Sequence, residues 1–295
     1  MKKKMLIVAN PCSGKGKARK CIGKIINWFS EAGFAITLSF TTCQGEARSL
    51  VGELAKDNDF IVCVGGDGTV NEVINGMIEN SIKKPIGYIP MGCTNDFASS
   101  LGISKNIKKT VKQIIEGTPK AIDVCKINDK YFAYVASFGL FAKSSSTSEQ
   151  KLKNRLGYFA YVLLGAKEIF NAPVINAKFK INGEEQQGKY ILGAVCNTRS
   201  VGGIIKLKDE DAQMNDGKFE LLCVNYPKSL FEMFKTLRDV KKRRWDTGRV
   251  LFKSMTELDV EYISTDYWSL DGEKFISDGK NLHFSILPNA IEILN

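Results

Sequence analysis

Histidine is almost absent from this chain of 295 residues, in which His283 is the only one. A metal site built on a pair of histidines is therefore excluded, and a single residue remains for a Ser-His-Asp triad. That residue stands in the alternating stretch Leu282–Ile286, a pattern that favours a strand position over a catalytic one. Any catalytic chemistry is expected to come from other side chains.

Paired cysteine motifs and long apolar runs are also missing. The eight cysteines form no Cys-x-x-Cys pair, which excludes zinc ribbons and thioredoxin-like motifs. Several stand in apolar runs, as buried free thiols do, and this usage is typical of a reducing compartment. No stretch approaches the roughly eighteen apolar residues of a membrane span. The apolar run after Lys4 is too short for a signal peptide. We therefore expect a cytoplasmic protein.

Acidic residues are outnumbered, with 32 of them against 42 basic residues and a net charge of +10. Such an excess indicates an anionic partner. Half of it falls in Lys228–Arg249, which holds eight basic and three acidic residues. Composition alone leaves two interpretations of this segment open, a solvated helix face and a docking surface.

Strands that alternate with helices dominate the first part of the chain. Apolar runs predict strands at 5–9, 36–40, 60–64 and 85–89, and helical spacing predicts helices at 17–31, 47–54 and 70–77. This order predicts a Rossmann-like, three-layer α/β domain over residues 1–123.

The pattern changes after Asp123 to short alternating runs, at 124–127, 131–137, 174–182, 187–196, 217–224, 257–262 and 281–286. They predict an antiparallel β-sandwich domain over residues 124–286. The first two runs read as a hairpin, and helices are expected at about 152–170 and 229–244. Residues 287–295 are expected to return to the first domain.

Three polar, glycine-rich loops follow predicted strands, and ligands of open parallel sheets bind at the carboxyl ends of the strands. The first loop is Asn10–Gly16. It is not a P-loop, because Gly16 stands where Ser or Thr is needed, and Arg19 interrupts the dinucleotide pattern. Its small residues can still expose backbone N–H groups to a phosphate at a helix start.

The second and third loops carry carboxylates. In Gly65–Thr69, three glycines surround Asp67, which can orient a nucleotide with its metal or cap the following helix. In Pro90–Phe97, the side chains of Thr94, Asn95 and Asp96 can bind phosphate or ribose, or cap the next helix. Three such loops without a catalytic histidine or a Walker lysine indicate phosphoryl transfer by positioning and metal.

The three loop motifs are Asn-Pro-x-Ser-Gly, Gly-Gly-Asp-Gly-Thr and Gly-x-Thr-Asn-Asp-Phe-Ala. In this order and spacing they resemble the diacylglycerol kinase catalytic family, which also holds sphingosine and ceramide kinases. The resemblance covers nearly the whole chain, since Gly202-Gly203, Asp216-Gly217-Lys218 and Leu270–Glu273 match as well. NAD kinases share the middle motif, and the implied first domain is NAD kinase-like.

The resemblance implies a kinase that uses ATP and Mg2+ to convert diacylglycerol to phosphatidic acid. It makes Glu273 the general base, with Asp271 holding the catalytic Mg2+ and Asp67 close to phosphates and metal. A second, structural Mg2+ would be held by Asp216 and the backbone carbonyls of Gln213 and Lys218. The implied ATP-binding residues are Asn10, Pro11, Cys12, Ser13, Gly14, Thr41, Gly66, Asp67, Gly68, Thr69, Asn71, Glu72, Thr94 and Asn95. Taken alone, both Asp-Gly pairs equally indicate hairpin turns.

One position departs from the family, because Ser99 stands where an arginine is usual. The acceptor is expected between the domains, where Phe132, Phe138 and Phe141 either line it or belong to the core. The expected partner is a lipid at the anionic inner face of the membrane. A homodimer through an exposed strand edge stays open.

Other functions remain as alternatives. They are an NAD kinase, a kinase for a sphingoid base, ceramide or another lipid alcohol, and a catalytically dead relative. A basic nucleic-acid-binding module around Lys241–Arg244 ranks lower, because it leaves the three loops unexplained. No nucleic acid partner is expected.

Overall fold

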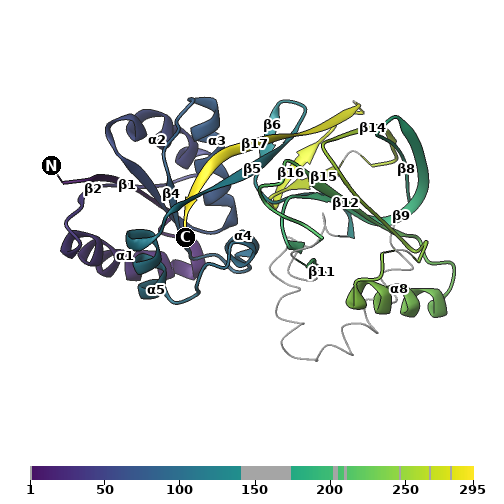
Figure 1. Cartoon of the computed structure of the whole chain (residues 1–295), viewed down its shortest axis with the longest axis horizontal. Coiled ribbons are helices and arrows are strands. Elements are labelled where there is room, and N and C mark those ends of the chain that lie inside the picture. Colours follow the sequence, from purple (N-terminus) through teal and green to yellow (C-terminus); the bar gives the residue numbers. More distant parts are fainter. Residues whose placement is uncertain are drawn as a thin grey trace.

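The computed structural model has an α/β domain and a β domain (Figure 1). It describes residues 2–140, 174–201, 205–208, 211–245, 247–265, 267–279 and 281–295. The helix expected at 152–170, Phe141 and Gly202-Gly203 lie outside these residues. In the described part of the chain, every helix is too short or too polar to cross a bilayer.

The first domain has three layers, as predicted. Its parallel sheet has the order β4-β3-β1-β2, with β1 at Lys4–Ala9, β2 at Ala35–Phe40, β3 at Phe60–Gly65 and β4 at Ile86–Pro90. Successive side chains of β1 point to opposite faces. Leu6 and Val8 pack with helices α2 (Glu46–Leu54) and α3 (Asp67–Glu79). Met5 and Ile7 pack with α1 (Ser13–Glu31) and α5 (Ile107–Glu116).

Three short helical segments of this domain were not assigned from the sequence. They are the 3-10 turn η1 (Ala55–Asp57), helix α4 (Asp96–Ser100) and helix α5. A signal for α5 was present, because Ile107, Val111 and Ile114 recur at helical spacing and pack against the sheet. Helix α4 is too short for periodicity to reveal, and its N-cap residue Asn95 makes no capping hydrogen bond through its side chain.

The second domain is antiparallel, as predicted. Its principal strands are β7 (Val135–Gly139), β8 (Ile175–Ile181), β9 (Glu184–Cys196), β12 (Phe219–Asn225), β13 (Val250–Met255), β14 (Glu257–Ile263), β15 (Tyr267–Leu270) and β16 (Glu273–Ile276). A small ladder joins β10 (Ser200–Val201) and β11 (Ile205–Lys206), and helix α8 spans Leu230–Lys242. Phe132 and Phe138 are fully buried in this core, where Phe138 packs edge-on against Trp268. The core interpretation of these two rings is therefore correct.

The two domains share one continuous sheet through two long strands, β5 (Pro119–Ile127) and β17 (Leu282–Leu294). Figure 1 shows β17 crossing from the β domain to the α/β domain. It pairs antiparallel with β14 and β5, and then parallel with β4 at Ile293 and Ile86. This shared ladder fixes how the domains face each other.

The hairpin expected after Asp123 forms between β5 and β6 (Lys130–Phe132). The prediction of one strand over Tyr131–Ser137 is wrong, because the chain leaves the ladder at Ala133 and Tyr134 before β7 begins. The backbone N–H groups of both residues donate to the carboxylate of Asp271 instead. That contact comes from a strand distant in sequence, so no local pattern could reveal it.

Candidate functional site

A cavity of about 410 Å³ opens at the carboxyl edge of the parallel sheet. Its lining includes residues of the first and second predicted nucleotide loops, none of the third loop, and one residue from the β domain. The lining residues are Asn10, Cys12, Ser13, Thr41, Thr42, Cys43, Gln44, Gly66, Gly68, Thr69, Glu72 and Glu273. Thr42, Cys43 and Gln44 were not predicted from the sequence. The signal for them was their place directly after β2, at the same sheet edge.

The first loop is held in a left-handed backbone conformation. Gly14, Lys15 and Gly16 all have positive φ, so the regular part of α1 starts at Lys17, as the spacing predicted. A side chain at Gly14 would place its Cβ 2.4 Å from the carbonyl oxygen of Met91, so only glycine fits there. The Asn10 side chain accepts from the N–H of Cys12 at 3.0 Å, which closes the loop.

The Asp67 carboxylate caps a neighbouring helix instead of its own, whose N-cap is Gly66. One oxygen accepts from the Thr94 hydroxyl at 3.1 Å and the Asp96 N–H at 3.3 Å, and the other from the Phe97 N–H at 3.3 Å. These groups belong to the third loop and the start of α4. Burial raises the pKa of Asp67, while the hydrogen bonds lower it.

Within the described residues no ion pair neutralises the Asp67 carboxylate. A buried carboxylate without a cationic partner is expensive, and its hard oxygens suit Mg2+. Both of its oxygens already accept hydrogen bonds, and Asp67 lines neither this cavity nor the neighbouring one, so its role in holding a metal beside a nucleotide stays a prediction.

Two further polar side chains, Glu72 in the cavity lining and Asn95 in the third loop, bond to backbone groups of nearby loops. The Glu72 carboxylate accepts from the N–H groups of Gly45 (2.9 Å) and Ala47 (3.1 Å), which cap the start of α2. Burial raises the pKa of Glu72, and the charge of Glu273 raises it further. The Asn95 amide bonds to the backbone N–H and carbonyl of Gly92 within its own loop. Glu72 thus orders the start of α2, and Asn95 orders the third loop, which was predicted to bind ATP.

Glu273 lies at the boundary between two cavities. It is half-buried at the start of β16, and it lines the first cavity together with a second one of about 410 Å³. The second cavity also includes Asn71, Lys130 and Lys274. A Cβ placed at Gly68 would lie 3.9 Å from Oε1 of Glu273, so this carboxylate faces the N-terminus of α3. A ligand bound in one cavity can therefore contact a ligand bound in the other, and the contact would lie beside the Glu273 carboxylate.

Asp271 is at the turn that presents Glu273. Leu270 pairs with Glu273 across a two-residue turn in which both Asp271 and Gly272 have positive φ, so the hairpin interpretation is correct here. The carboxylate accepts from the N–H groups of Ala133 (2.6 Å), Val135 (2.8 Å) and Tyr134 (3.1 Å). Burial raises the pKa of Asp271 to about 7, against the effect of these donors.

This arrangement does not fit the role of metal ligand that the resemblance implies for Asp271. The side chain is 3% exposed, both of its oxygens already accept backbone N–H groups, and it lines neither cavity. The carboxylate instead ties the β15–β16 turn to the backbone before β7.

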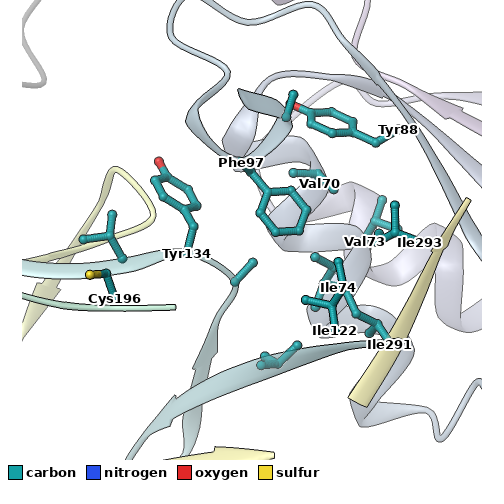
Figure 2. Close-up of a cluster of buried hydrophobic side chains, with 14 of the residues drawn as sticks. Val70, Val73, Ile74, Tyr88, Phe97, Ile122, Tyr134, Cys196, Ile291 and Ile293 are labelled. Carbon is teal, nitrogen blue, oxygen red and sulfur yellow. The ribbon is translucent and has the colours of Figure 1, made fainter. Parts of the chain in front are cut away.

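Tyr134 is a residue near the site that the sequence did not indicate, because it stands in an apolar run. Figure 2 shows it between Cys196 of the β domain and Phe97 of the α/β domain. Burial raises the pKa of its phenol, and the nearby charges of Asp271, Asp67, Asp96 and Glu273 raise it further. The hydroxyl therefore stays protonated between acidic side chains and can donate a hydrogen bond.

The loop before β12 carries the residues assigned to a structural metal. Asp216 is exposed and accepts from the N–H of Lys218 at 3.0 Å, while buried Asp123 accepts from the N–H of Gly217 at 2.7 Å. The hairpin interpretation is wrong here, because β12 pairs with β9 and β13 and not with the preceding segment.

Glu220 stands close to this loop and is buried, and its Oε2 has no hydrogen-bond partner in the described structure. Burial raises its pKa to about 8, and the charges of Asp216 and Asp211 contribute. Carboxylate and carbonyl oxygens in such an acidic environment fit Mg2+, although the described residues hold no cluster of three or more acidic, His or Cys ligands.

Ser99, the residue that departs from the family motif, is exposed on α4.

The sequence and the fold of this chain are similar to those of known proteins. The family model of the diacylglycerol kinase catalytic domain matches residues 4–127. The diacylglycerol kinase of Bacillus subtilis (strain 168) is 36% identical over 224 residues, which cover 75% of this chain and 74% of that protein. That of Staphylococcus carnosus (strain TM300) is 34% identical over 225 residues, covering 76% and 73%. The crystal structure of a candidate diacylglycerol kinase from Bacillus anthracis has a TM-score of 0.79 at 26% identity, covering 99% of this chain and 97% of that one.

Proposed function

The chain belongs to the diacylglycerol kinase catalytic family and is a lipid kinase, and we propose that it transfers the γ-phosphate of ATP, with Mg2+, to the hydroxyl of diacylglycerol to give phosphatidic acid. One observation carries the proposal. The Glu273 carboxylate comes from the β domain and borders both the cavity formed by the nucleotide loops and a second cavity beside it.

ATP occupies the first cavity in this proposal. The loop from Asn10 to Gly14 and the start of α3 present backbone N–H groups, which suit phosphate oxygens at a helix N-terminus. Thr41 and Thr69 line the same cavity with hydroxyls. Asp67 would hold a Mg2+ ion that neutralises the charge on the phosphates.

Glu273 acts as the general base. Its carboxylate accepts the proton of the lipid hydroxyl as that oxygen forms a bond to the γ-phosphorus. The bond from this phosphorus to the oxygen bridging it to the β-phosphate breaks, and ADP leaves. Asp271 supports this step by fixing the turn that carries Glu273.

Asp216 would hold a second Mg2+ together with the backbone carbonyls of Gln213 and Lys218. Such an ion would stabilise the loop before β12, which packs through Gly217 on buried Asp123. The acceptor lies in a bilayer, so we place the enzyme at an anionic membrane surface as a peripheral protein.

The test is transfer of labelled phosphate from ATP to diacylglycerol in mixed micelles that contain an anionic lipid. A parallel reaction offers NAD as acceptor. We expect labelled phosphatidic acid with the native protein and with the matched control Glu257→Gln, an exposed carboxylate on β14, and loss of at least a hundredfold in rate with Glu273→Gln. Product from NAD alone would reject the proposal, and product from a sphingoid base or ceramide alone would reject diacylglycerol as the acceptor.

A further inference from the structure

Helix α8 exposes three large apolar side chains at its N-terminal end. Leu230 is 57% exposed, Phe231 69% and Phe234 46%. They are three of the seven large hydrophobic residues that are exposed in the described part of the chain. Isolated exposed apolar residues are ordinary, whereas three on neighbouring helical positions form a patch.

Basic residues continue the same side of the helix toward its C-terminus. At 100° per residue, Phe234, Arg238 and Lys241 follow Leu230 on one face, and Lys235 and Lys242 follow Phe231. The Lys235 ammonium lies 4.3 Å from the centre of the Phe231 ring. The α8 face is therefore apolar over its first turns and cationic over its last ones. Its residues are Leu230, Phe231, Phe234, Lys235, Arg238, Lys241 and Lys242.

The acidic residues of α8 are engaged elsewhere. Glu232 accepts from the N–H of Lys228 at 2.7 Å at the start of the helix, where Ser229 caps it. Asp239 is 1% exposed and forms an ion pair with Arg249. The opposite face, with Met233 and Thr236, is buried. Carboxylates are thus absent from the exposed face of this described helix.

We propose that the α8 face docks the enzyme on an anionic lipid bilayer. Phe231 and its apolar neighbours would enter the region between headgroups and acyl chains, and the basic end would contact anionic headgroups. A second copy of the chain fits this face less well, because the exposed face of α8 offers no carboxylate to the basic residues of a partner α8. The inference rests on the proposed function only in that the lipid acceptor lies in a membrane.

The first experiment measures binding of the full-length protein to vesicles by sedimentation, without ATP or diacylglycerol. Vesicles of phosphatidylcholine alone are compared with vesicles of equal parts phosphatidylcholine and phosphatidylglycerol. We expect binding to the anionic vesicles that weakens at high salt. Binding should weaken at least tenfold in Phe231→Ser/Phe234→Ser and in Arg238→Glu/Lys242→Glu.

Matched controls are Tyr262→Ser, which removes another exposed aromatic ring, and Lys108→Glu/Lys109→Glu, which reverses two adjacent exposed lysines on α5. Both should bind vesicles within about twofold of the native protein. Equal binding by the native protein and both α8 variants would overturn the proposal. A different result would replace the proposal with an interface between two copies of the chain. In that result the Phe231/Phe234 variant binds vesicles as the native protein does, and a dimer of the native protein dissociates in this variant.

A second readout separates docking from catalysis. The α8 variants should phosphorylate a short-chain diacylglycerol dissolved as monomers at the native rate, and lose at least tenfold in rate on long-chain diacylglycerol in anionic vesicles. Loss of both activities by the α8 variants would refute a pure docking role. Inactivity of the native protein on every diacylglycerol, with vesicle binding intact, would reject the proposed function and leave the docking surface supported.

Discussion

Replacing Asp271 with Asn tests whether this buried carboxylate positions Glu273 or binds metal. The carboxylate receives three backbone N–H groups, two on one oxygen and that of Ala133 on the other. An Asn side chain keeps one oxygen and turns an NH2 group toward a backbone donor. One buried donor then loses its acceptor, which costs about 1–3 kcal/mol, and the remaining bonds lose their charge assistance.

We therefore expect Asp271→Asn to lower the free energy of unfolding by about 2–4 kcal/mol. The turn between Leu270 and Glu273 should relax, and a displacement of about 1 Å at a catalytic group can cost about a hundredfold in rate. We predict a kcat reduced by about ten- to a hundredfold. The KM for ATP and the Mg2+ concentration for half-maximal activity should stay within about threefold of native, because Asp271 lines neither cavity.

The assays are steady-state kinetics at pH 8, titration with Mg2+, and urea unfolding. Glu273→Gln serves as the comparison, because it should lose rate while its unfolding free energy stays within about 0.5 kcal/mol of native. If Asp271 acts only through Glu273, the double variant should be no slower than Glu273→Gln alone. A tenfold rise in the Mg2+ requirement, with rate restored at saturating Mg2+, would refute positioning and support a metal ligand.

Three further predictions concern residues outside the turn. Between about pH 4.5 and 8 the native Glu220 carboxyl keeps a proton that the unfolded chain releases, so its contribution to the unfolding free energy should fall by about 1.4 kcal/mol per pH unit as pH rises. Urea unfolding across this window should show a slope that is shallower in Glu220→Gln by the contribution of one proton, because Asp271, with a pKa raised to about 7, still contributes. Adding Mg2+ in place of a chelator should raise the Tm of the native protein but not of Asp216→Asn, as scanning calorimetry would show, and equal shifts would contradict the structural metal. Gly14→Ala should weaken ATP binding at least tenfold in calorimetric titration, because its Cβ meets the Met91 carbonyl at 2.4 Å, and unchanged affinity would show that the loop adjusts.

Much of the candidate site could be predicted from the sequence, because its loops directly follow strands of a parallel sheet. Apolar strand residues such as Phe60–Gly65 are recognised by composition, and the polar glycine-rich residues after them must lie at the carboxyl edge of a parallel sheet. Most residues predicted to bind ATP do line one cavity there. The missed residues Thr42 and Cys43 obey the same rule, although their loop has less glycine.

The partners of individual side chains were beyond the sequence. Asp67 could be recognised as a capping residue, but the helix that it caps begins near Asp96, and only the packing of two loops brings them together. Asp271 accepts from N–H groups more than 130 residues earlier in the chain. Such contacts depend on how β15 lies against β7, which local patterns do not encode.

The sequence by itself determined the three-layer first domain, the antiparallel second domain and the place of the nucleotide loops, because side-chain periodicity and turn chemistry act over a few residues. Only the tertiary structure decided that Glu273 borders the nucleotide cavity and that both oxygens of Asp271 accept backbone hydrogen bonds. It also decided that the acidic residues of α8 bond to groups away from the exposed face of this helix. The first of these outcomes depends on the shared ladder of β5 and β17, which sets one domain against the other, and the second on the pairing of β15 with β7.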